Sequence, residues 1–362
     1  CFNPIEEFLG QLLGGMSDDD LNLISAYGID QIPMVYSLFV DWHDHDEYFG
    51  TFGEETQEIL SAQDALEEFW SKPTAFDGGF RTDNILLVGM HGADMKDLGK
   101  LIPTLEVMYD LNGTNYTHTE LATEIQAIIQ TMPYEYDNPI FTFNAFAYPA
   151  GEEGDKIVMG DGIIEYLHYR NAGMEGPEFI LGHEFGHHMQ FEIDLPPLGG
   201  LPESLETRRY ELMADALSAY FLAHEAGAHM RDHRILELQH AAFSVGDCNG
   251  MDPGHHGTPR QRGCAVAWGI GRAANATGAD DVMHPADFGA LFDQNLDKIM
   301  GLDESVCSHS FGSVPGGPRN TPGQTNSTTD TNDSTTKVSV TTVTTTTREE
   351  TVTTTRTETV SD

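Results

Sequence analysis

The segment Gly182-His-Glu-Phe-Gly-His-His-Met-Gln190 constrains the fold more than any other part of the chain. Apolar residues within and before it recur at helical spacing, so we expect a helix here. Gly182 and Gly186 each cost about 1 kcal/mol inside a helix, and such a cost is typical of close packing against another backbone. The sequence therefore predicts a helix that lies tightly against a neighbouring element.

Two histidines of this helix are predicted to point the same way. His183 and His187 are four residues apart, which places their imidazoles one turn apart on one face. Two imidazoles in this arrangement can bind one zinc ion, and Glu184 is placed to accept a proton from an attacking water. His188 lies about 100° further round the helix than His187, so we interpret it as a surface or packing residue.

A second helix is expected over residues 208–221, where apolar residues keep helical spacing. The Pro/Gly-rich stretch 195–202 supplies the reversal that would bring the two helices antiparallel. A catalytic zinc site needs a third protein ligand, which we assign to Glu211. Asp215, one turn later, would then hold the distal N–H of a ligand imidazole and fix its orientation.

Together these motifs resemble a known family. HEFGHHMQ followed by RRYELMADALSAY is similar to the neutral zinc metallopeptidases of the gluzincin group, which share HExxH and ExxAD. The segments 144–149 and 157–162 also resemble the approach to the active-site helix in the CAAX prenyl protease and its bacterial heat-shock relatives. The resemblance covers residues 139–272. It implies a zincin-like fold, with two antiparallel site helices beside a small sheet and a peptide substrate along an edge strand.

The same resemblance extends to a downstream histidine. In these relatives a His followed six residues later by Arg lies at the mouth of the site, and His256 and Arg262 match that spacing. The resemblance implies a catalytic role for His256 as a donor to the developing oxyanion, with His255 as the alternative donor and Arg262 orienting the segment. Thr258 and Pro259 are independently typical of a helix N-cap and first position. A capped surface helix with incidental histidines is therefore the alternative interpretation.

The rest of the chain before residue 313 is mainly helical in pattern. Ser17 and Thr56 are typical helix starts. Alternating residues predict strands over 139–148 and 156–159, the second leading into a helix from near Ile163. The predicted fold class is α+β, mainly helical, with a small sheet beside the HExxH helix of a zincin-like catalytic domain. Helical spacing occurs over 17–27, 55–70, 94–110 and 118–131.

The composition changes sharply near residue 313. Residues 313–362 contain almost no large apolar side chain and cannot bury enough surface to offset the entropy of ordering them. We therefore expect an acidic zincin-like domain over 1–312, with its site core over 139–272, and a disordered Thr-rich tail over 313–362. Since the chain contains no apolar run of about 18 residues, we expect no transmembrane segment.

The charge of the chain excludes one class of partner. Eighteen Lys and Arg residues against 58 Asp and Glu residues give a formal net charge of −40. So acidic a surface repels phosphate backbones, which excludes nucleic-acid binding. It also leaves open an alternative function as an acidic extracellular matrix protein that binds calcium or mineral.

The cysteines and the N-glycosylation sequons indicate the cellular compartment in which the protein is expected. The four cysteines contain no CxxC pair, which argues against a Cys-type zinc site. A chain that begins at Cys1 suggests removal of a signal segment, and Cys1 either pairs with another cysteine or carries a lipid. Five Asn-X-Ser/Thr sequons fit an exported protein. We also predict a disulfide between Cys248 and Cys264, which flank a Gly/Pro-rich loop.

Residues and resemblance together lead us to expect a secreted or envelope-attached zinc metalloendopeptidase that hydrolyses a peptide or protein substrate. Attachment would run through a lipid on Cys1 or through the tail. The alternative function that uses the same zinc site is that of an extracellular protein that binds zinc without catalysing a reaction. The expected roles are Zn2+ binding by His183, His187 and Glu211, support by Asp215, and catalysis by Glu184 and His256.

Overall fold

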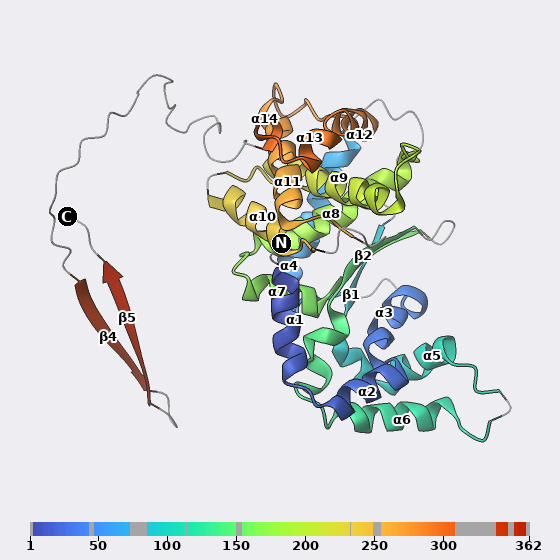
Figure 1. Ribbon diagram of the computed structural model, residues 1–362. Coiled ribbons are helices and arrows are strands. Elements are labelled where there is room, and N and C mark those ends of the chain that lie inside the picture. The colour runs from blue at the N-terminus through green and yellow to red at the C-terminus, as the bar shows by residue number, and fades with distance from the viewer. Residues whose placement is uncertain are drawn as a thin grey trace. The chain divides into compact units, whose positions relative to one another are not determined.

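A three-stranded sheet lies between two groups of helices in the first part of the chain (Figure 1). The structure is a computed structural model that describes residues 3–42, 47–72, 85–112, 114–149, 154–231, 233–248, 255–307, 338–346 and 351–359. Contacts divide the chain into two units, Cys1–Pro318 and Arg319–Asp362. The HExxH motif belongs to the first unit.

The first group of helices precedes and surrounds one end of the sheet. Its α2 helix begins with a capping box, in which Ser17 and Asp20 each accept a hydrogen bond from the other's backbone N–H, as the start at Ser17 predicts. The elements are α1 (Pro4–Gly14), α2 (Asp18–Tyr27), η1 (Ile29–Gln31), α3 (Ile32–Val35), η2 (Tyr36–Val40), α4 (Thr56–Ser71), η3 (Gly92–Lys96), α5 (Leu98–Met108), α6 (His118–Ile129), η4 (Glu135–Asp137) and η5 (Pro139–Thr142).

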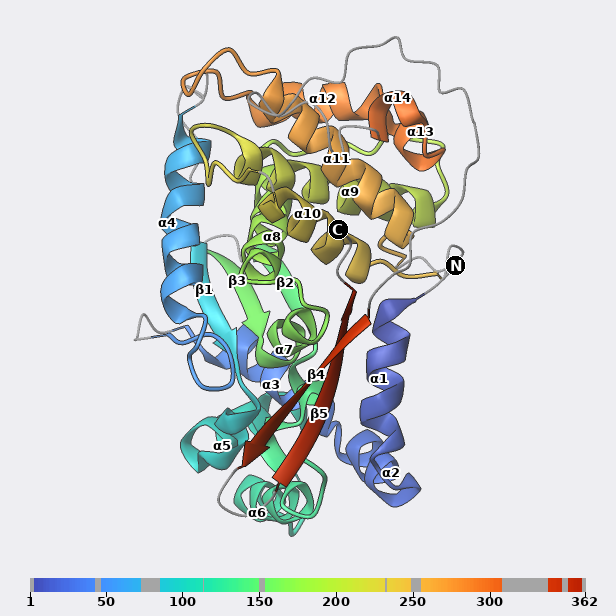
Figure 2. The ribbon, with the colours of Figure 1, turned by 90° about the vertical axis from the view of Figure 1, so that its left-hand side faces the viewer.

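The second group contains the HExxH helix and packs on the other side of the sheet, where α4 of the first group joins it. Figure 2 shows α8 and α9 above the sheet. In the same view α4 lies beside β1, and α1 lies on the opposite side of the sheet from α4. The elements are α7 (Asp161–Tyr169), α8 (Glu175–Glu192), α9 (Glu203–Ala223), α10 (His233–Ser244), α11 (Pro259–Ala274), α12 (Pro285–Asp293), α13 (Leu296–Met300) and α14 (Glu304–Cys307).

The sheet has the order β1-β3-β2, with β1 (Ile85–Met90) parallel and β2 (Ala145–Pro149) antiparallel to the central β3 (Asp155–Gly160). The strand predicted over 156–159 is therefore confirmed. The strand predicted over 139–148 is wrong in its first half, where the chain forms η5. Asn138 causes the difference, because its side chain accepts a hydrogen bond from the Ile140 N–H at 3.1 Å and starts a helical turn.

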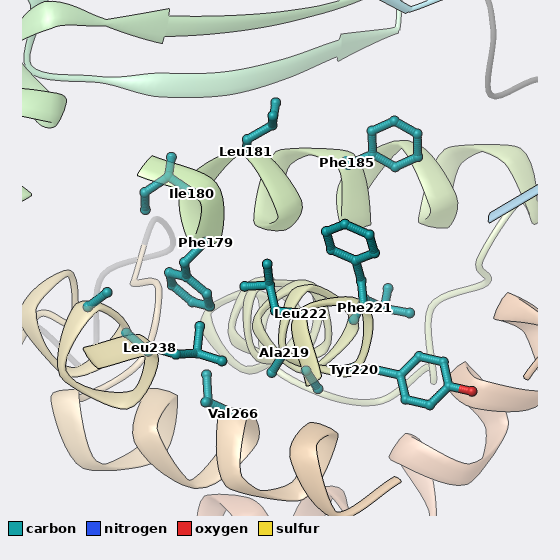
Figure 3. Close-up of a cluster of buried hydrophobic side chains, with 14 of the residues drawn as sticks. Phe179, Ile180, Leu181, Phe185, Ala219, Tyr220, Phe221, Leu222, Leu238 and Val266 are labelled. Atoms are coloured by element: carbon teal, nitrogen blue, oxygen red, sulfur yellow. The ribbon is translucent and has the colours of Figure 1, made fainter. Parts of the chain in front are cut away.

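Four helices on the side of the sheet where α8 lies contribute much of the main core. Figure 3 shows apolar side chains from α8, α9, α10 and α11 meeting in one cluster, with Leu181 and Phe185 pointing from α8 toward the sheet. Phe179 on α8 and Leu222 on α9 are fully buried in the same cluster. Because α8 is surrounded in this way, the side chains on its HExxH turns are held in place by packing on several sides.

The two glycines of the HExxH segment face α9 at close range. A Cβ on Gly182 would lie 2.5 Å from Ser218 Oγ, and one on Gly186 would lie 3.1 Å from Ala214 Cα. Any larger residue would push the two helices apart. The close packing predicted from these glycines is confirmed.

A buried lysine ties the sheet to the first group of helices. Lys156 on β3 is fully buried, and its Nζ donates to the carbonyl oxygens of Ser37 and Asp41, each at 2.6 Å. Its ammonium also lies 3.6 Å from the ring centroid of Trp42. These contacts satisfy a buried charge at the end of η2 and fix η2 against β3.

The predicted Cys248–Cys264 disulfide is wrong. Cys264 on α11 is bonded to Cys307 on α14, 43 residues away. Cys248 is also disulfide-bonded, so no cysteine in the described part of the chain is free. The pairing joins two helices that pack together, a relationship that the spacing of cysteines along the chain does not reveal.

The predicted fold class is confirmed in the first unit, which is mainly helical with a small sheet beside α8. In the second unit, β4 (Val338–Thr346) and β5 (Thr351–Thr359) form an antiparallel pair. Runs of Thr and Val favour extended backbone, which accounts for these strands. The boundary at 312 and the disorder of the rest of the tail stay predictions.

Within the described ranges no single helix is long and apolar enough to cross a membrane. The bent pair Asp18–Tyr27 and Ile29–Val40 reaches the required length and hydropathy only when its two helices are taken together.

Candidate active site

The HExxH helix α8 and the following helix α9 run antiparallel. Near one end of the pair, Ser218 Oγ donates to the Phe179 carbonyl at 2.9 Å. Near the other end, Gln190 Nε2 donates to the Tyr210 carbonyl at 2.8 Å. The loop at 195–202 therefore makes the reversal that the sequence predicts, and it brings the ExxAD turn of α9 opposite the HExxH turn of α8.

Three side chains converge between these helices. His183 Nε2 lies 3.2 Å from His187 Nε2, while Glu211 places Oε2 3.3 Å from His183 Nε2 and Oε1 3.5 Å from His187 Nε2. Their potential ligand atoms all lie within 4.8 Å of one another. Two imidazole nitrogens and one carboxylate oxygen are a donor set that suits catalytic zinc, so the side chains fit this ion.

Asp215 and Arg262 support the first of these imidazoles. Asp215 Oδ1 lies 2.9 Å from His183 Nδ1, and Asp215 is completely buried. Arg262, from α11, donates through Nε to Asp215 Oδ2 at 2.8 Å and through Nη2 to Oδ1 at 2.6 Å. With Asp215 accepting from Nδ1–H, the Nε2 lone pair of His183 is directed toward His187 and Glu211.

The second imidazole has a different partner, one that the sequence reasoning did not identify. Gln190 Oε1 lies 2.9 Å from His187 Nδ1, and the same amide donates from Nε2 to Tyr210. Gln190 thus accepts the Nδ1–H of His187 and leaves its Nε2 free for a metal. The signal was present in the sequence, because Gln190 follows His187 by three residues and shares its face of the helix.

Glu184 and His188 occupy contrasting positions. Glu184 is 6% exposed and lines a cleft together with His183 and His187. His188 is completely buried, with Nε2 3.1 Å from the Lys156 carbonyl oxygen and Nδ1 3.3 Å from Asp155 Oδ2. His188 is therefore a packing residue between α8 and β3, which is one of the two interpretations that its position on the helix gave.

The downstream histidines lie around Asp247. The His256 N–H donates to Asp247 Oδ2 at 2.9 Å, and its side chain, 55% exposed, lines the cleft. His255 is buried, and its Nδ1 contacts Asp247 Oδ1. Only His256 is in a position to meet a substrate in the cleft, and its catalytic role stays a prediction. Thr258 caps α11 as predicted, in a capping box with Gln261.

Arg262 lies deeper than the resemblance implies. We expected it to orient the segment that carries the two downstream histidines, yet its guanidinium is directed at Asp215 and at the Val245 carbonyl oxygen, 3.2 Å from Nη1. Arg262 therefore acts on His183 through Asp215. Its spacing from His256 says nothing about this contact, which depends on how α11 packs against α9.

The electrostatics of the three converging side chains follow from their mutual contacts. Burial opposes a charge on His183, but hydrogen bonds to Asp215 and Glu211 outweigh burial and raise the His183 pKa to about 10. Burial likewise opposes a charge on His187, yet Glu211 raises its pKa. Burial alone would raise the pKa of Glu211, but the charge of His187 and hydrogen bonds from both imidazoles hold it well below its usual range. Metal and protons therefore compete for this site.

The converging side chains open into a cavity of about 530 Å³. This volume lies in the usual range for ligand pockets, about 300–1,000 Å³. The edge strand β2 contributes Ala145 and Ala147 to one wall, and Ile5 of α1 contributes to another. The cavity is large enough to receive part of a peptide next to Glu184.

Residues 117–192 match the model of Peptidase family M48. This match supports a zinc metallopeptidase family for the chain. The matched M48 segment runs from α6 to the end of α8 and includes His183, Glu184 and His187, while Glu211 and Arg262 lie beyond it and are placed by the geometry. M48 peptidases are zinc-dependent, in agreement with the donor set found here. No curated protein and no solved structure matches the chain.

Proposed function

We propose that this chain is a zinc metalloendopeptidase that acts outside the cytoplasm. One observation carries the proposal: His183, His187 and Glu211 converge at the wall of a cavity that also contains a buried Glu184. A purely structural zinc site would close its fourth position with another protein ligand, whereas an open position is typical of catalysis. The arrangement therefore favours hydrolysis over storage of the metal.

The chain's own residues divide the chemistry among themselves. Zinc held by His183, His187 and Glu211 would supply a Lewis acid that polarises the scissile carbonyl and activates water near neutral pH. Glu184 accepts a proton from the attacking water and delivers it to the leaving amine. His256, exposed on the cavity wall, is the candidate donor to the developing oxyanion.

The edge strand β2 supports endopeptidase activity, which is cleavage within a substrate peptide rather than only at its ends. In the described part of the sheet, β2 pairs with β3 on one side, and Ala145 and Ala147 line the cavity. A strand with one edge available can pair with an extended peptide that passes the site in both directions.

Location outside the cytoplasm rests on separate observations. The Cys264–Cys307 disulfide is typical of oxidising compartments. Asn112 and Asn115, both in sequons, are exposed, where a glycan would meet no steric obstacle. We propose that attachment to a surface runs through the Thr-rich segment 313–362 or through a lipid on Cys1. Cys1 lies outside the described ranges.

The test combines metal analysis with digestion of a peptide library, with and without a chelator. We expect one zinc per chain and chelator-sensitive cleavage. Glu184→Gln should retain zinc and fold but lose hydrolysis, because an amide cannot accept the proton, whereas Glu211→Ala should lose zinc. Cleavage by Glu184→Gln at the wild-type rate would contradict the mechanism. Stoichiometric zinc with no hydrolysis would favour a binding protein, and many weak calcium sites without zinc would favour a matrix protein.

A further inference from the structure

A short loop carries His256 to the cavity. Residues 255–258 lead into α11, and among them His256 lines the cavity. Its side chain is 55% exposed, so packing alone does not fix the imidazole. A hydrogen-bond donor contributes to catalysis only from a fixed position. The contacts of the loop that carries His256 therefore decide whether this side chain can act.

Asp247 contacts this loop at three successive residues. Its Oδ2 accepts a hydrogen bond from the His256 N–H at 2.9 Å. Its backbone N–H donates to the Gly257 carbonyl oxygen at 3.0 Å. Its Oδ1 contacts Nδ1 of His255, whose side chain is completely buried. One residue from an earlier part of the chain thus holds the backbone on both sides of the His256 side chain.

Two glycines pack this arrangement against the neighbouring helices. Gly257 has a φ of +113°, and a Cβ there would lie 3.0 Å from Leu212 Cδ2 on α9. Gly246 directly precedes Asp247, and a Cβ there would lie 2.4 Å from the backbone nitrogen of Pro259 on α11. Asp247 and the loop are therefore fixed to α9 and α11, the helices that bear the third proposed metal ligand and the guanidinium behind it.

We propose that Asp247 is a positioning residue, which holds the His256 imidazole where it donates to the developing oxyanion. The inference rests on the proposed function, in which His256 is the candidate donor. Asp247 is not one of the described residues that line the cavity, so it acts through the loop and not on the substrate. A displacement of about 1 Å in a catalytic group can cost about 100-fold in rate.

A carboxylate that only stabilised the fold would affect catalysis in a different way. Its loss would loosen the protein whether or not the imidazole of His256 is present, so the effects of Asp247→Ala and His256→Ala on kcat would multiply. If Asp247 acts through His256, the effect of Asp247→Ala disappears once that imidazole has been removed. A double-mutant cycle measures this difference.

Asp281 provides a matched control. Its Oδ2 also braces a loop, because it accepts hydrogen bonds from the Thr277 N–H at 2.8 Å and from the Thr277 hydroxyl at 2.9 Å. Asp281 is exposed and is not among the described residues that line the cavity. Asp281→Ala thus removes the same kind of contact from a different loop, and it should leave turnover unchanged.

The experiment uses the zinc-loaded full chain and measures two quantities besides zinc content. Cleavage of one peptide gives kcat and KM. Calorimetry gives the Kd of a phosphinic peptide of the same sequence, whose tetrahedral phosphorus and oxygens resemble the transition state. The variants are Asp247→Ala, Asp247→Asn, His256→Ala, the double variant Asp247→Ala with His256→Ala, and Asp281→Ala.

We expect every variant to keep its zinc. His256→Ala should lower kcat about 100-fold, and Asp247→Ala should lower it at least about tenfold. KM should change by less than about twofold in both, since the lost contact forms only in the transition state. Affinity for the phosphinic peptide should fall in parallel with kcat. The double variant should match His256→Ala, and Asp247→Asn, which keeps one acceptor oxygen, should lie between wild type and Asp247→Ala.

The outcomes separate this inference from the proposed function. Effects of Asp247→Ala and His256→Ala that multiply in the double variant, or an unchanged kcat in His256→Ala, overturn the inference while the peptidase function stands. An equal loss in Asp281→Ala and Asp247→Ala overturns it as well. Losses of phosphinic-peptide affinity that do not multiply, without any cleavage by the wild type, overturn the function while the positioning of His256 stands. If Asp247→Ala does not fold, Asp247→Asn takes its place in the cycle.

Discussion

Arg262 holds Asp215 through both carboxylate oxygens, with Nε 2.8 Å from Oδ2 and Nη2 2.6 Å from Oδ1. Both side chains are buried, and Asp215 contacts His183 through the oxygen that Nη2 also approaches. Two parallel hydrogen bonds fix the plane of the carboxylate as well as its position. The direction of the His183 imidazole is therefore set from a helix that contributes no metal ligand.

Arg262→Leu should destabilise the protein and weaken zinc binding together. Removal of the guanidinium leaves the buried Asp215 carboxylate without its cationic partner, a change that typically costs about 3–5 kcal/mol. A less well-oriented imidazole should lower zinc affinity about 10–100-fold. Thermal unfolding and competitive zinc titration measure the two effects.

Arg260, on the same helix and exposed, offers the control for that experiment. Arg260→Leu should change neither quantity, and Arg262→Lys should fall between, since an ammonium cannot bridge both oxygens. Unchanged zinc affinity in Arg262→Leu would show that the orientation of His183 does not depend on this pair.

Two substitutions of Gln190 should affect zinc affinity and the packing of α8 against α9 separately. Gln190→Leu removes the acceptor for His187 Nδ1–H, so zinc affinity should fall about 10–100-fold. Gln190→Glu keeps an acceptor for His187 but cannot donate to Tyr210, so it should retain zinc while losing about 1–3 kcal/mol of stability, because its carboxylate then faces the Tyr210 carbonyl oxygen without a hydrogen to donate. The prediction is wrong if both variants lose zinc to the same degree in a competitive titration.

Zinc binding should release protons near neutral pH. His183 has its pKa raised to about 10, and that of His187 is also raised, so the metal-free site carries protons that a metal must displace. Zinc affinity should therefore fall about tenfold per pH unit for each proton released as the pH is lowered. Calorimetry at pH 7 in buffers of different ionisation enthalpy counts the protons, and a count of zero would contradict the contacts described for Glu211.

The same raised pKa sets how the stability of the metal-free protein depends on pH. The folded-state value for His183 lies above its ordinary value of 6.5. Its proton therefore stabilises the metal-free fold fully below pH 6.5, and that contribution is lost as the pH rises through about 10. Denaturant titrations of the metal-free protein across this range should show the loss, whereas His183→Ala should remove it.

Cleavage of the Cys264–Cys307 bond should destabilise the second group of helices. Closing a loop over a separation of 43 residues contributes about 4 kcal/mol in the chain-entropy model. Replacement of both cysteines by Ser should lower the midpoint of denaturant unfolding without changing the zinc content under native conditions. Peptide mapping of the unreduced protein tests the pairing itself, and recovery of a Cys248–Cys264 peptide would overturn it.

The sequence predicted those features of the fold and of the site that depend on residues close together along the chain. The capping pairs at Ser17 and Thr258, the close approach at Gly186 and the facing imidazoles on α8 all follow from short spacings. The α+β fold class follows from the same patterns. These features are local because one helical turn, or one cap, contains all the atoms involved.

What could not be predicted depends on contacts between distant segments. The 3₁₀ turn at η5 replaced an expected strand because a single Asn side chain satisfies the backbone there. The partner of Cys264 and the partner of Arg262 are both set by packing of α11, against α14 and α9 respectively. Nothing in the spacing of these residues encodes that packing, so pattern reasoning placed Cys264 with the wrong partner and did not identify the contact of Arg262 with Asp215.

The candidate metal site is assembled across a wide interval of sequence, since the contact between His183 and Arg262 spans 79 residues. During synthesis, domains fold from the N-terminus as the chain emerges. A nascent chain that has emerged only through α8 presents two imidazoles without Glu211, and one that ends before α11 has Asp215 without its guanidinium. A complete set of zinc ligands therefore exists only after synthesis has passed α9, and the imidazole of His183 gains its full support only after synthesis has passed the start of α11.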